Sequence, residues 1–324
     1  MKASVYRKYG PPEVLTIEEV ARPIPQSDEI LIKVICSTIN RTDCGFRSAE
    51  YVISRLFSGL FRPKLNILGS EFAGIVQEVG ASVTQFKVGD KVFGFDDKKF
   101  GGHAEYKCIG ENKAVATIPE GVNFEEAAAI LEGSHYALCD IRAAKVQKGQ
   151  KVLVNGATGA IGSAAVQLLK HYETEVTAIC DTKNMDLVKS LGADKVLDYT
   201  KEDYTNTSER YDFVFDAVGK SSFGQAKKVL KEKGIYISTE LGKGGENIYL
   251  ALWTPFFSKK KLLFPIPTIN KEDTLFIRSL VETKQFMPVL DRTYKLDDIV
   301  EATKYVETGQ KIGNVVLEIG ENEA

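Results

Sequence analysis

The chain has 324 residues, of which 44% are hydrophobic and 27% are charged, and its formal net charge is −2. This size and composition predict a soluble globular protein of two domains. With no excess of basic residues we expect no nucleic-acid partner, and no apolar run approaches the about 18 residues that span a bilayer.

The N-terminus and the cysteines bear on the location of the protein. Charge appears almost at the start of Met1–Arg7, which favours a first strand over a signal peptide. The five cysteines are an odd number, are widely scattered and include no Cys-x-x-Cys pair. We therefore expect neither a disulfide framework nor a thiolate zinc knuckle, and a cytoplasmic protein is the simplest interpretation.

Residues 1 to about 122 are predicted to form short strands separated by turns. The β-rich or glycine-bounded runs are Thr16–Val20, Glu29–Ile35, Gly74–Gly80 and Val88–Gly94. Because the pattern of a parallel sheet is absent, a small all-β barrel is favoured.

From about Asn123 the pattern changes to alternating strands and helices, after a helical region that begins at Phe124–Leu131. Strands are predicted over Lys151–Val154, Glu175–Cys180, Lys195–Asp198, Phe213–Phe215, Ile235–Ser238 and Leu262–Phe264. Helices are predicted over Ile161–His171, Met185–Leu191 and Gln225–Leu230. Six strands in this alternation indicate an open, doubly wound parallel sheet with its ligand at the carboxyl edge.

The C-terminal part is predicted to be helical over Lys271–Lys284 and Leu296–Thr308. The terminal strand Asn314–Ile319 is expected to return to the first domain. Two apolar stretches, Tyr51–Arg62 and Trp253–Phe264, have two interpretations. They form a membrane-surface patch, or the first shapes an acceptor pocket and the second supplies an edge strand that pairs across a homodimer. The second interpretation, a homodimer with no membrane contact, is favoured.

The run Lys151–Gly162 carries the strongest functional signal. A β-branched strand leads into a glycine-rich turn and then into a helix, the context in which such a turn binds a dinucleotide pyrophosphate. Gly159 lets the backbone approach the phosphates, Gly162 lets the helix pack closely, and the helix N-terminus supplies unpaired N–H donors. The residues predicted to bind the cofactor here are Thr158, Gly159, Ala160, Ile161 and Gly162.

Asp181 follows the predicted strand Glu175–Cys180, 19 residues after Gly162. An acidic residue at this place accepts both ribose hydroxyls, and its charge repels a 2′-phosphate, which favours NADH over NADPH. Lys183 favours NADPH instead, because its ammonium group can pair with that phosphate. The alternative role for Asp181 is to cap the helix that begins near Asn184. The sequence therefore predicts an NAD(P)H cofactor with a mild preference for NADH.

Motifs along nearly the whole chain resemble the medium-chain dehydrogenase/reductase superfamily, in its zinc-independent, quinone oxidoreductase-like branch. They are Gly69–Gly74, Val88–Gly94, Ala157–Gly162, Leu191–Asp194, Asp216–Gly219 and Gly313–Val316. The resemblance implies an α/β protein with a GroES-like β-barrel catalytic domain and a Rossmann doubly wound parallel-sheet cofactor domain. The first would span residues 1–122, completed by about 269–324, and the second residues 123–268, with the active site between them.

The chain departs from the zinc-dependent members of this superfamily at the ligand positions. They place a cysteine where this chain has Asn40, a histidine where it has Ser70, and a third ligand near Glu132. Asn and Ser are poor zinc ligands, and Phe95–Ala104 is short and contains no cysteine for a structural zinc lobe. We therefore expect no metal, the alternative being a stray ion held by Glu71 and Glu132.

A site without a Lewis acid favours reduction of an electron-poor acceptor, a quinone or an α,β-unsaturated carbonyl, over oxidation of an alcohol. Asn40 and Asp43 match the Asn-x-x-Asp of the quinone reductase branch, which lies near the nicotinamide and the acceptor. The Asn40 amide would stabilise charge on the acceptor oxygen; the alternative is that the pair only forms a turn. His135 and Tyr51 are weaker candidates for a proton donor, and water is the alternative.

For the cofactor, the resemblance adds residues beyond the glycine turn. They are Tyr199 near the adenosine ribose or phosphate, Val218 and Gly219 at the adenine edge, Leu241 and Gly242 near the nicotinamide, and Asn314 from the terminal segment. Core packing is the alternative role for Val218 and Leu241. Two other functions stay open: a zinc-type alcohol dehydrogenase, and a non-catalytic nucleotide-binding or scaffold protein.

Overall fold

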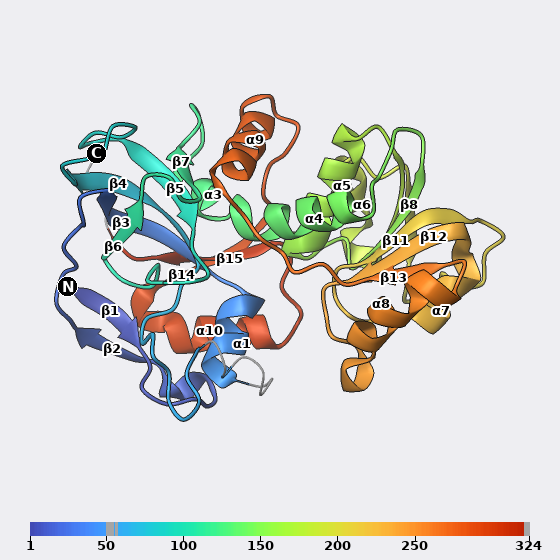
Figure 1. Ribbon diagram of the computed structural model, residues 1–324, viewed down its shortest axis with the longest axis horizontal. Coiled ribbons are helices and arrows are strands. Elements are labelled where there is room, and N and C mark those ends of the chain that lie inside the picture. Colours follow the sequence, from blue (N-terminus) through green and yellow to red (C-terminus); the bar gives the residue numbers. More distant parts are fainter. Residues whose placement is uncertain (50–54, 56–57, 321–324) are drawn as a thin grey trace. The chain divides into compact units, whose positions relative to one another are not determined.

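The computed structural model describes residues 1–49, 55 and 58–320, and the chain divides into two compact units (Figure 1). Unit 1 comprises Met1–Glu132, Ile269–Glu282 and Pro288–Ala324. Unit 2 comprises Gly133–Thr268 and Thr283–Met287. Unit 1 is thus assembled from both ends of the chain, and each unit is described by itself below.

Unit 1 is built on a seven-stranded sheet with the order β14-β15-β3-β4-β5-β7, and β6 pairs with β3. The strands are β3 (Glu29–Ile39), β4 (Glu71–Val79), β5 (Lys91–Phe95), β6 (Tyr106–Gly110), β7 (Val115–Thr117), β14 (Leu290–Lys295) and β15 (Asn314–Glu318). All pairs are antiparallel except β14 with β15. A separate antiparallel pair is formed by β1 (Lys2–Val5) and β2 (Thr16–Glu19). The mostly antiparallel sheet confirms the β-rich domain predicted for this part, but not its all-β character, because Arg41–Ser48 forms a helix.

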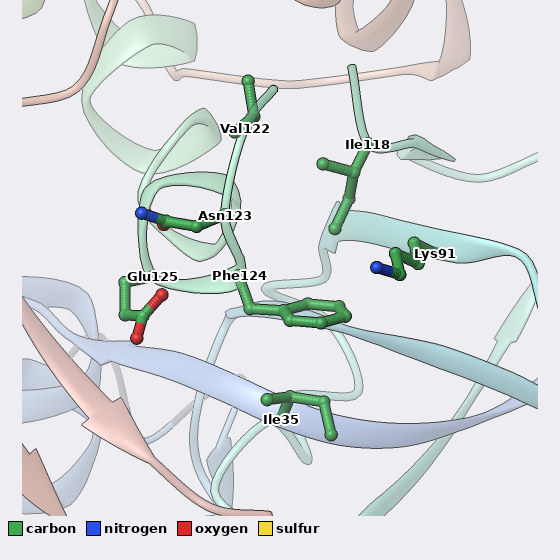
Figure 2. Close-up of a pocket in the computed structure, with 7 residues that line it drawn as sticks. All are labelled: Ile35, Lys91, Ile118, Val122, Asn123, Phe124 and Glu125. Atoms are coloured by element: carbon green, nitrogen blue, oxygen red, sulfur yellow. The ribbon is translucent and has the colours of Figure 1, made fainter. Parts of the chain in front are cut away.

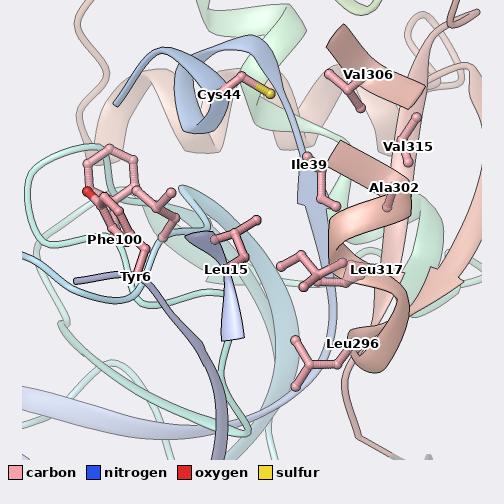
Figure 3. Close-up of a cluster of buried hydrophobic side chains, with 12 residues drawn as sticks. Tyr6, Leu15, Ile39, Cys44, Phe100, Leu296, Ala302, Val306, Val315 and Leu317 are labelled. Atoms are coloured by element: carbon pink, nitrogen blue, oxygen red, sulfur yellow. The ribbon is translucent and has the colours of Figure 1, made fainter. Parts of the chain in front are cut away.

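Helices whose bounds fall within the described residues also belong to or start in unit 1. They are α1 (Arg41–Ser48), α3 (Phe124–Ala128), α4 (Leu131–Ala143), α9 (Lys271–Glu282) and α10 (Ile299–Glu307). A buried apolar cluster joins Ile39 of β3, Cys44 of α1 and Leu317 of β15 to Ala302 and Val306 of α10 (Figure 3). Each fully buried Ile or Leu contributes about 1.5–3 kcal/mol. This packing fixes the point where β3 turns into α1.

Unit 2 contains a six-stranded sheet, parallel throughout, with the order β10-β9-β8-β11-β12-β13. The strands are β8 (Lys151–Asn155), β9 (Glu175–Cys180), β10 (Lys195–Asp198), β11 (Tyr211–Asp216), β12 (Leu230–Ser238) and β13 (Lys261–Leu263). The strand order reverses between β8 and β11, and ligands of such sheets bind outside the carboxyl ends at that point. The doubly wound Rossmann sheet predicted from the sequence is confirmed.

The helices of unit 2, besides the rest of α4, are α5 (Ala160–His171), α6 (Met185–Ser190), α7 (Phe223–Val229) and α8 (Glu246–Phe257). Short 3₁₀ helices cover Pro12–Val14, Thr182–Asn184, Lys243–Gly245 and Leu296–Asp298. Within the described residues, no helix is both long enough and apolar enough to cross a membrane.

The edge strand predicted within Trp253–Phe264, at Leu262–Phe264, is confirmed to within one residue as β13 (Lys261–Leu263). The aromatic residues Trp253–Phe257 before it belong to helix α8, which was not predicted. A continuous apolar run has no clear period, so its pattern cannot separate a strand from a helix. Of the other apolar stretch, residues 51–54, 56 and 57 lie outside the described residues, Tyr51 among them.

Candidate functional site

The glycine turn after β8 contains two glycines with different roles. Gly156 adopts a φ of +78°, and a Cβ on Gly162 would lie 2.0 Å from the Gly156 carbonyl oxygen. Gly162 is therefore required by close packing of α5 on the turn. A Cβ on Gly159 would meet only the Gly156 oxygen, at 3.8 Å. A methyl group at Gly159 would therefore fit without a clash.

The N-terminus of α5 carries three unused backbone donors. Gly159 is the N-cap residue and supplies no side-chain cap, and the first amide bonded back to it is that of Ser163, at 2.8 Å. The N–H groups of Ala160, Ile161 and Gly162 donate to no described residue. Such a terminus, with the positive end of the helix dipole, favours an anionic group.

Gly133 of α4 holds this helix start in place and was not predicted. A Cβ on Gly133 would lie 2.4 Å from the Ala160 carbonyl oxygen, so α4 and the first turn of α5 approach more closely than any side chain permits. The sequence did contain a signal, a glycine inside a helical pattern. Because glycine lowers helix stability, its presence there usually has a packing or functional reason.

The residues predicted to recognise the adenosine half follow two neighbouring strands, β9 and β10. Asp181 Oδ1 accepts from Asn184 N at 3.2 Å and from Asn184 Nδ2 at 2.6 Å, so the capping role is present. Asp181 Oδ2 accepts from no described residue. Tyr199 is 64% exposed and its N–H donates to the Cys180 carbonyl, while the Lys183 side chain is exposed.

Val218 and Gly219 lie on the loop after β11, which the buried Asp216 carboxylate organises. That carboxylate accepts from Asn155 Nδ2 at 3.0 Å, Ser221 N at 2.9 Å and Tyr236 Oη at 3.1 Å. The loop brings Val218 against the glycine turn, because a Cβ on Gly156 would lie 2.4 Å from Val218 Cγ1.

Leu241 and Gly242 follow β12. Their loop is fixed by Asn247, whose N–H donates to the Leu241 carbonyl at 3.0 Å and whose Nδ2 donates to Glu240 O at 2.7 Å. Gly242 has a φ of +73°, which favours glycine. The predicted cofactor residues of unit 2 therefore lie on the loops after β8, β9, β10, β11 and β12.

Asn40 and Asp43 form a reciprocal capping box at the start of α1. Asn40 Oδ1 accepts from Asp43 N at 2.9 Å, and Asp43 Oδ2 accepts from Asn40 N at 3.2 Å. Asn40 Nδ2 donates to Ser70 Oγ at 2.8 Å, and Asp43 Oδ1 accepts from Gly69 N at 3.0 Å. The turn-forming alternative is thus present, and it leaves one Nδ2 proton of Asn40 uncommitted.

Glu71 and Glu132, buried beside this box, are linked through the backbone. Glu71 Oε1 accepts from the N–H groups of Leu131, at 2.9 Å, and Glu132, at 2.7 Å, while its Oε2 accepts from Thr38 Oγ1 at 2.6 Å. Burial raises the pKa of Glu71 to about 7. The sequence could not show this contact, because 60 residues separate Glu71 from Leu131.

In the described part of the chain, the Glu132 carboxylate has a hydrogen-bond partner at only one of its two oxygens. Its Oε1 accepts from Thr42 Oγ1 at 2.9 Å, but its buried Oε2 has no hydrogen-bond partner among the described residues. Burial first, and then the charges of Glu71 and Asp43, raise the pKa of Glu132 well above its usual value. Burial likewise lowers the pKa of Lys311, and Glu132 opposes that shift.

The remaining candidates hold structural contacts. His135 is buried in α4 with its ring 4.6 Å from that of Tyr136. Asn314 Nδ2 donates to the Val289 carbonyl at 3.1 Å. None of these contacts identifies a proton donor, and Tyr51 lies outside the described residues.

A separate pocket in unit 1 has a volume of about 260 Å³ (Figure 2). Its lining residues are Ile35, Lys91, Ile118, Val122, Asn123, Phe124 and Glu125, none of which was predicted to bind cofactor or substrate. The Lys91 ammonium lies 5.5 Å from the centre of the Phe124 ring, so a cation already faces this aromatic wall.

Comparison with known proteins identifies the family to which the chain belongs. A family model described as alcohol dehydrogenase GroES-like domain matches residues 26–129, and one described as zinc-binding dehydrogenase matches residues 191–317. The chain is 33% identical to 2-methylene-furan-3-one reductase of Solanum lycopersicum, over 98% of this chain and 79% of the relative. It is also 33% identical to a chloroplastic quinone-oxidoreductase homolog of Spinacia oleracea, over 98% of each. The solved quinone oxidoreductase of Coxiella burnetii superposes with a TM-score of 0.87, at 29% identity and 99% coverage of both chains.

Proposed function

Since the chain belongs to the medium-chain dehydrogenase/reductase superfamily, in its quinone oxidoreductase-like branch, we propose that it reduces quinones or α,β-unsaturated carbonyls with NAD(P)H. Its similar relatives carry the names of a furanone reductase and of quinone oxidoreductases, whose substrates are electron-poor in this sense. The nicotinamide supplies the hydride, and the protein positions donor and acceptor.

The observation that carries the proposal is the unused N-terminus of α5. Three amides at the start of α5 donate to no described residue, a Cβ on the adjacent Gly159 would meet only one protein atom within 4 Å, and Gly133 and Gly162 allow the close packing of this turn. This donor set fits a dinucleotide pyrophosphate, which is anionic and accepts hydrogen bonds. Thr158–Gly162 would hold it, with Val218 and Gly219 lining the adenine side.

The preference for NADH is supported by Asp181. One carboxylate oxygen caps the turn at Asn184, and the other is left to accept from ribose hydroxyls. A negative charge at this position disfavours a 2′-phosphate. Lys183 is exposed and forms no ion pair with a described residue, so it weakens this preference without reversing it.

Reduction without zinc is supported by the donor groups around Asn40. Where zinc-dependent members have cysteine and histidine, an amide and a hydroxyl here hydrogen-bond to each other. Both are poor zinc ligands. The uncommitted Nδ2 proton of Asn40 is suited to donate to an acceptor oxygen as charge develops on it, and Asp43 positions Asn40 through the capping box.

The test is NADH and NADPH oxidation against a panel of quinones, enones and simple alcohol–ketone pairs, with and without a chelator, together with elemental analysis. We expect turnover of quinones or enones that the chelator does not change, and less than about a tenth of a zinc per chain. Stoichiometric zinc with chelator-sensitive alcohol oxidation would instead support the dehydrogenase alternative. Cofactor binding without turnover of any acceptor would support a non-catalytic protein.

A further inference from the structure

Helix α8 of unit 2 exposes a continuous apolar face. Leu252, Phe256 and Phe257 are 71%, 81% and 68% exposed, and Tyr249 and Trp253 are 69% and 55% exposed. These residues lie 3, 4, 7 and 8 positions after Tyr249, the spacing that places side chains on one side of a helix. We call this set the α8 aromatic face.

The opposite side of α8 packs against unit 2. Thr254 Oγ1 accepts from Leu262 N of β13 at 2.9 Å and donates to the Leu262 carbonyl at 3.2 Å. Leu250 and Ala251 contact the buried apolar cluster of unit 2. The helix is therefore anchored through Thr254, Leu250 and Ala251 while its largest rings face outward, whereas an ordinary surface helix turns polar residues to that side. Figure 1 shows α8 beside β13 and α7.

Basic residues flank the α8 aromatic face. Lys259–Lys261 directly follow the helix, and the Lys260 ammonium hydrogen-bonds to the Lys227 carbonyl at the end of α7, which brings Lys227 and Lys228 close. Residues 223–264 contain eight lysines against three glutamates, with no arginine or aspartate, in a chain of net charge −2. Lys259 forms an exposed ion pair with Glu232 at 3.0 Å, so Lys227, Lys228, Lys260 and Lys261 supply most of the positive charge near the exposed rings.

We propose that the α8 aromatic face and its flanking lysines dock on an anionic lipid bilayer surface. Tryptophan, tyrosine and phenylalanine rings partition to the boundary between headgroups and acyl chains, and each nearby lysine is attracted by anionic lipid. A second copy of the chain fits this surface less well. A two-fold contact brings a patch against itself, so the two lysine flanks would face each other.

Trp253 makes the proposal directly measurable, because it is the only tryptophan of the chain. The full chain is titrated with vesicles of phosphatidylcholine containing phosphatidylserine and with vesicles of phosphatidylcholine alone. We expect Trp253 emission to shift to shorter wavelength, and the protein to float with the vesicles, only with the anionic lipid. Both signals should weaken at high salt, because screening reduces the attraction of the lysines.

Two variants separate the aromatic and basic contributions. Phe256→Ser/Phe257→Ser and the charge reversal Lys259→Glu/Lys260→Glu/Lys261→Glu should each lower partitioning onto anionic vesicles by roughly tenfold or more. Matched controls in unit 1 are Ile24→Ser, at a residue 87% exposed, and Lys8→Glu/Lys87→Glu/Lys113→Glu at three exposed lysines. The controls should bind like the unchanged protein, and equal losses in the controls would overturn the proposal.

Two further results would also overturn it. One is the absence of both flotation and a Trp253 shift with anionic vesicles. The other is a Trp253 shift that grows with protein concentration without lipid, accompanied by dimers in sedimentation velocity that Phe256→Ser/Phe257→Ser abolishes. That outcome would show that a second copy covers the α8 aromatic face. Neither readout depends on cofactor or turnover, so the proposal stands or fails apart from the proposed enzymatic function.

Discussion

The Glu71 carboxylate accepts the backbone N–H of Glu132 at 2.7 Å, so one buried acid fixes the first turn of the helix that carries the other. Both acids are buried, and burial raises the pKa of each. Glu71, whose pKa is about 7, therefore titrates in the folded protein near neutral pH.

We expect Glu71 to make stability depend on pH. The unfolded chain releases the Glu71 proton near the usual pKa of 4.5 and the folded protein near 7, so the free energy of unfolding falls as pH rises through this window. Glu71→Gln removes the charge and keeps an acceptor for the amides of Leu131 and Glu132. Relative to the unchanged protein, the variant should gain up to roughly 3 kcal/mol between pH 5 and pH 8, measured by urea unfolding.

Glu111 provides a control of opposite sign. Its carboxylate accepts from the N–H groups of Gln85, at 2.8 Å, and Thr84, at 2.9 Å, and these bonds lower its pKa. Glu111→Gln should therefore lose stability relative to the unchanged protein as pH rises through its titration. A Glu71→Gln difference that is the same at pH 5 and pH 8 would refute the assignment.

The two glycines of the turn should separate folding from cofactor binding. Gly162→Ala forces a Cβ onto a backbone oxygen and should destabilise the fold by about 2–3 kcal/mol or more. Gly159→Ala has room for its Cβ and should keep the melting temperature, but it should weaken NADH binding roughly tenfold because the methyl group occupies the space of the pyrophosphate. Thermal melts and NADH fluorescence titration measure the two effects. Unchanged NADH affinity in Gly159→Ala would show that the pyrophosphate lies elsewhere.

Asp181→Ser should shift cofactor preference toward NADPH. Serine is an effective N-cap, so the turn at Asn184 is retained while the charge that repels a 2′-phosphate is lost. The ratio of kcat/KM for NADPH to that for NADH should rise roughly tenfold. Asp186→Ser, at a nearby carboxylate that is 99% exposed, is the matched control and should leave the ratio unchanged. An unaltered ratio in Asp181→Ser would mean that Asp181 serves only as a cap.

Asn40→Ser tests the amide donor without removing the cap. A serine oxygen can still accept from Asp43 N, whereas the Nδ2 donor is lost. We expect kcat to fall roughly tenfold with little change in the KM for cofactor. Asn123→Ser removes the equivalent amide from the matching capping box at α3 and should not affect kcat. If both variants retain full kcat, Asn40 is a capping residue alone.

The sequence predicted the elements whose boundaries are set by local chemistry. Strands β9 and β10 are short apolar or β-branched runs between polar or turn residues, and both have the predicted ends. Helix α1 was missed because Arg41–Ser48 is mostly polar and contains a glycine, although Asn40 and Asp43 carry a cap signal. Helix α8 was not predicted, because an apolar run such as Leu250–Phe257 does not by itself separate a helix from a strand.

The candidate site likewise has a part that the sequence predicts and a part that it does not. The glycine turn and Asp181 were recognisable because their residues are close in sequence and follow strands. The contact of Glu71 with the start of α4, and the approach of Gly133 to Ala160, join residues far apart in the chain. Only the folded backbone brings these groups together, so no local sequence pattern predicts these contacts.

The position of β15 has a consequence for synthesis of the chain on the ribosome. Val315–Glu318 pairs with Cys36–Ile39, the half of β3 that leads into Asn40 and its polar neighbours. That half therefore lacks a partner along one edge until Asn314–Glu318 has been synthesised, whereas unit 2 needs nothing after Met287. Unit 2 is therefore free to fold first, and unit 1 must wait for Asn314–Glu318 to emerge. A nascent chain that stalls before Asn314 would expose an unpaired strand edge to aggregation.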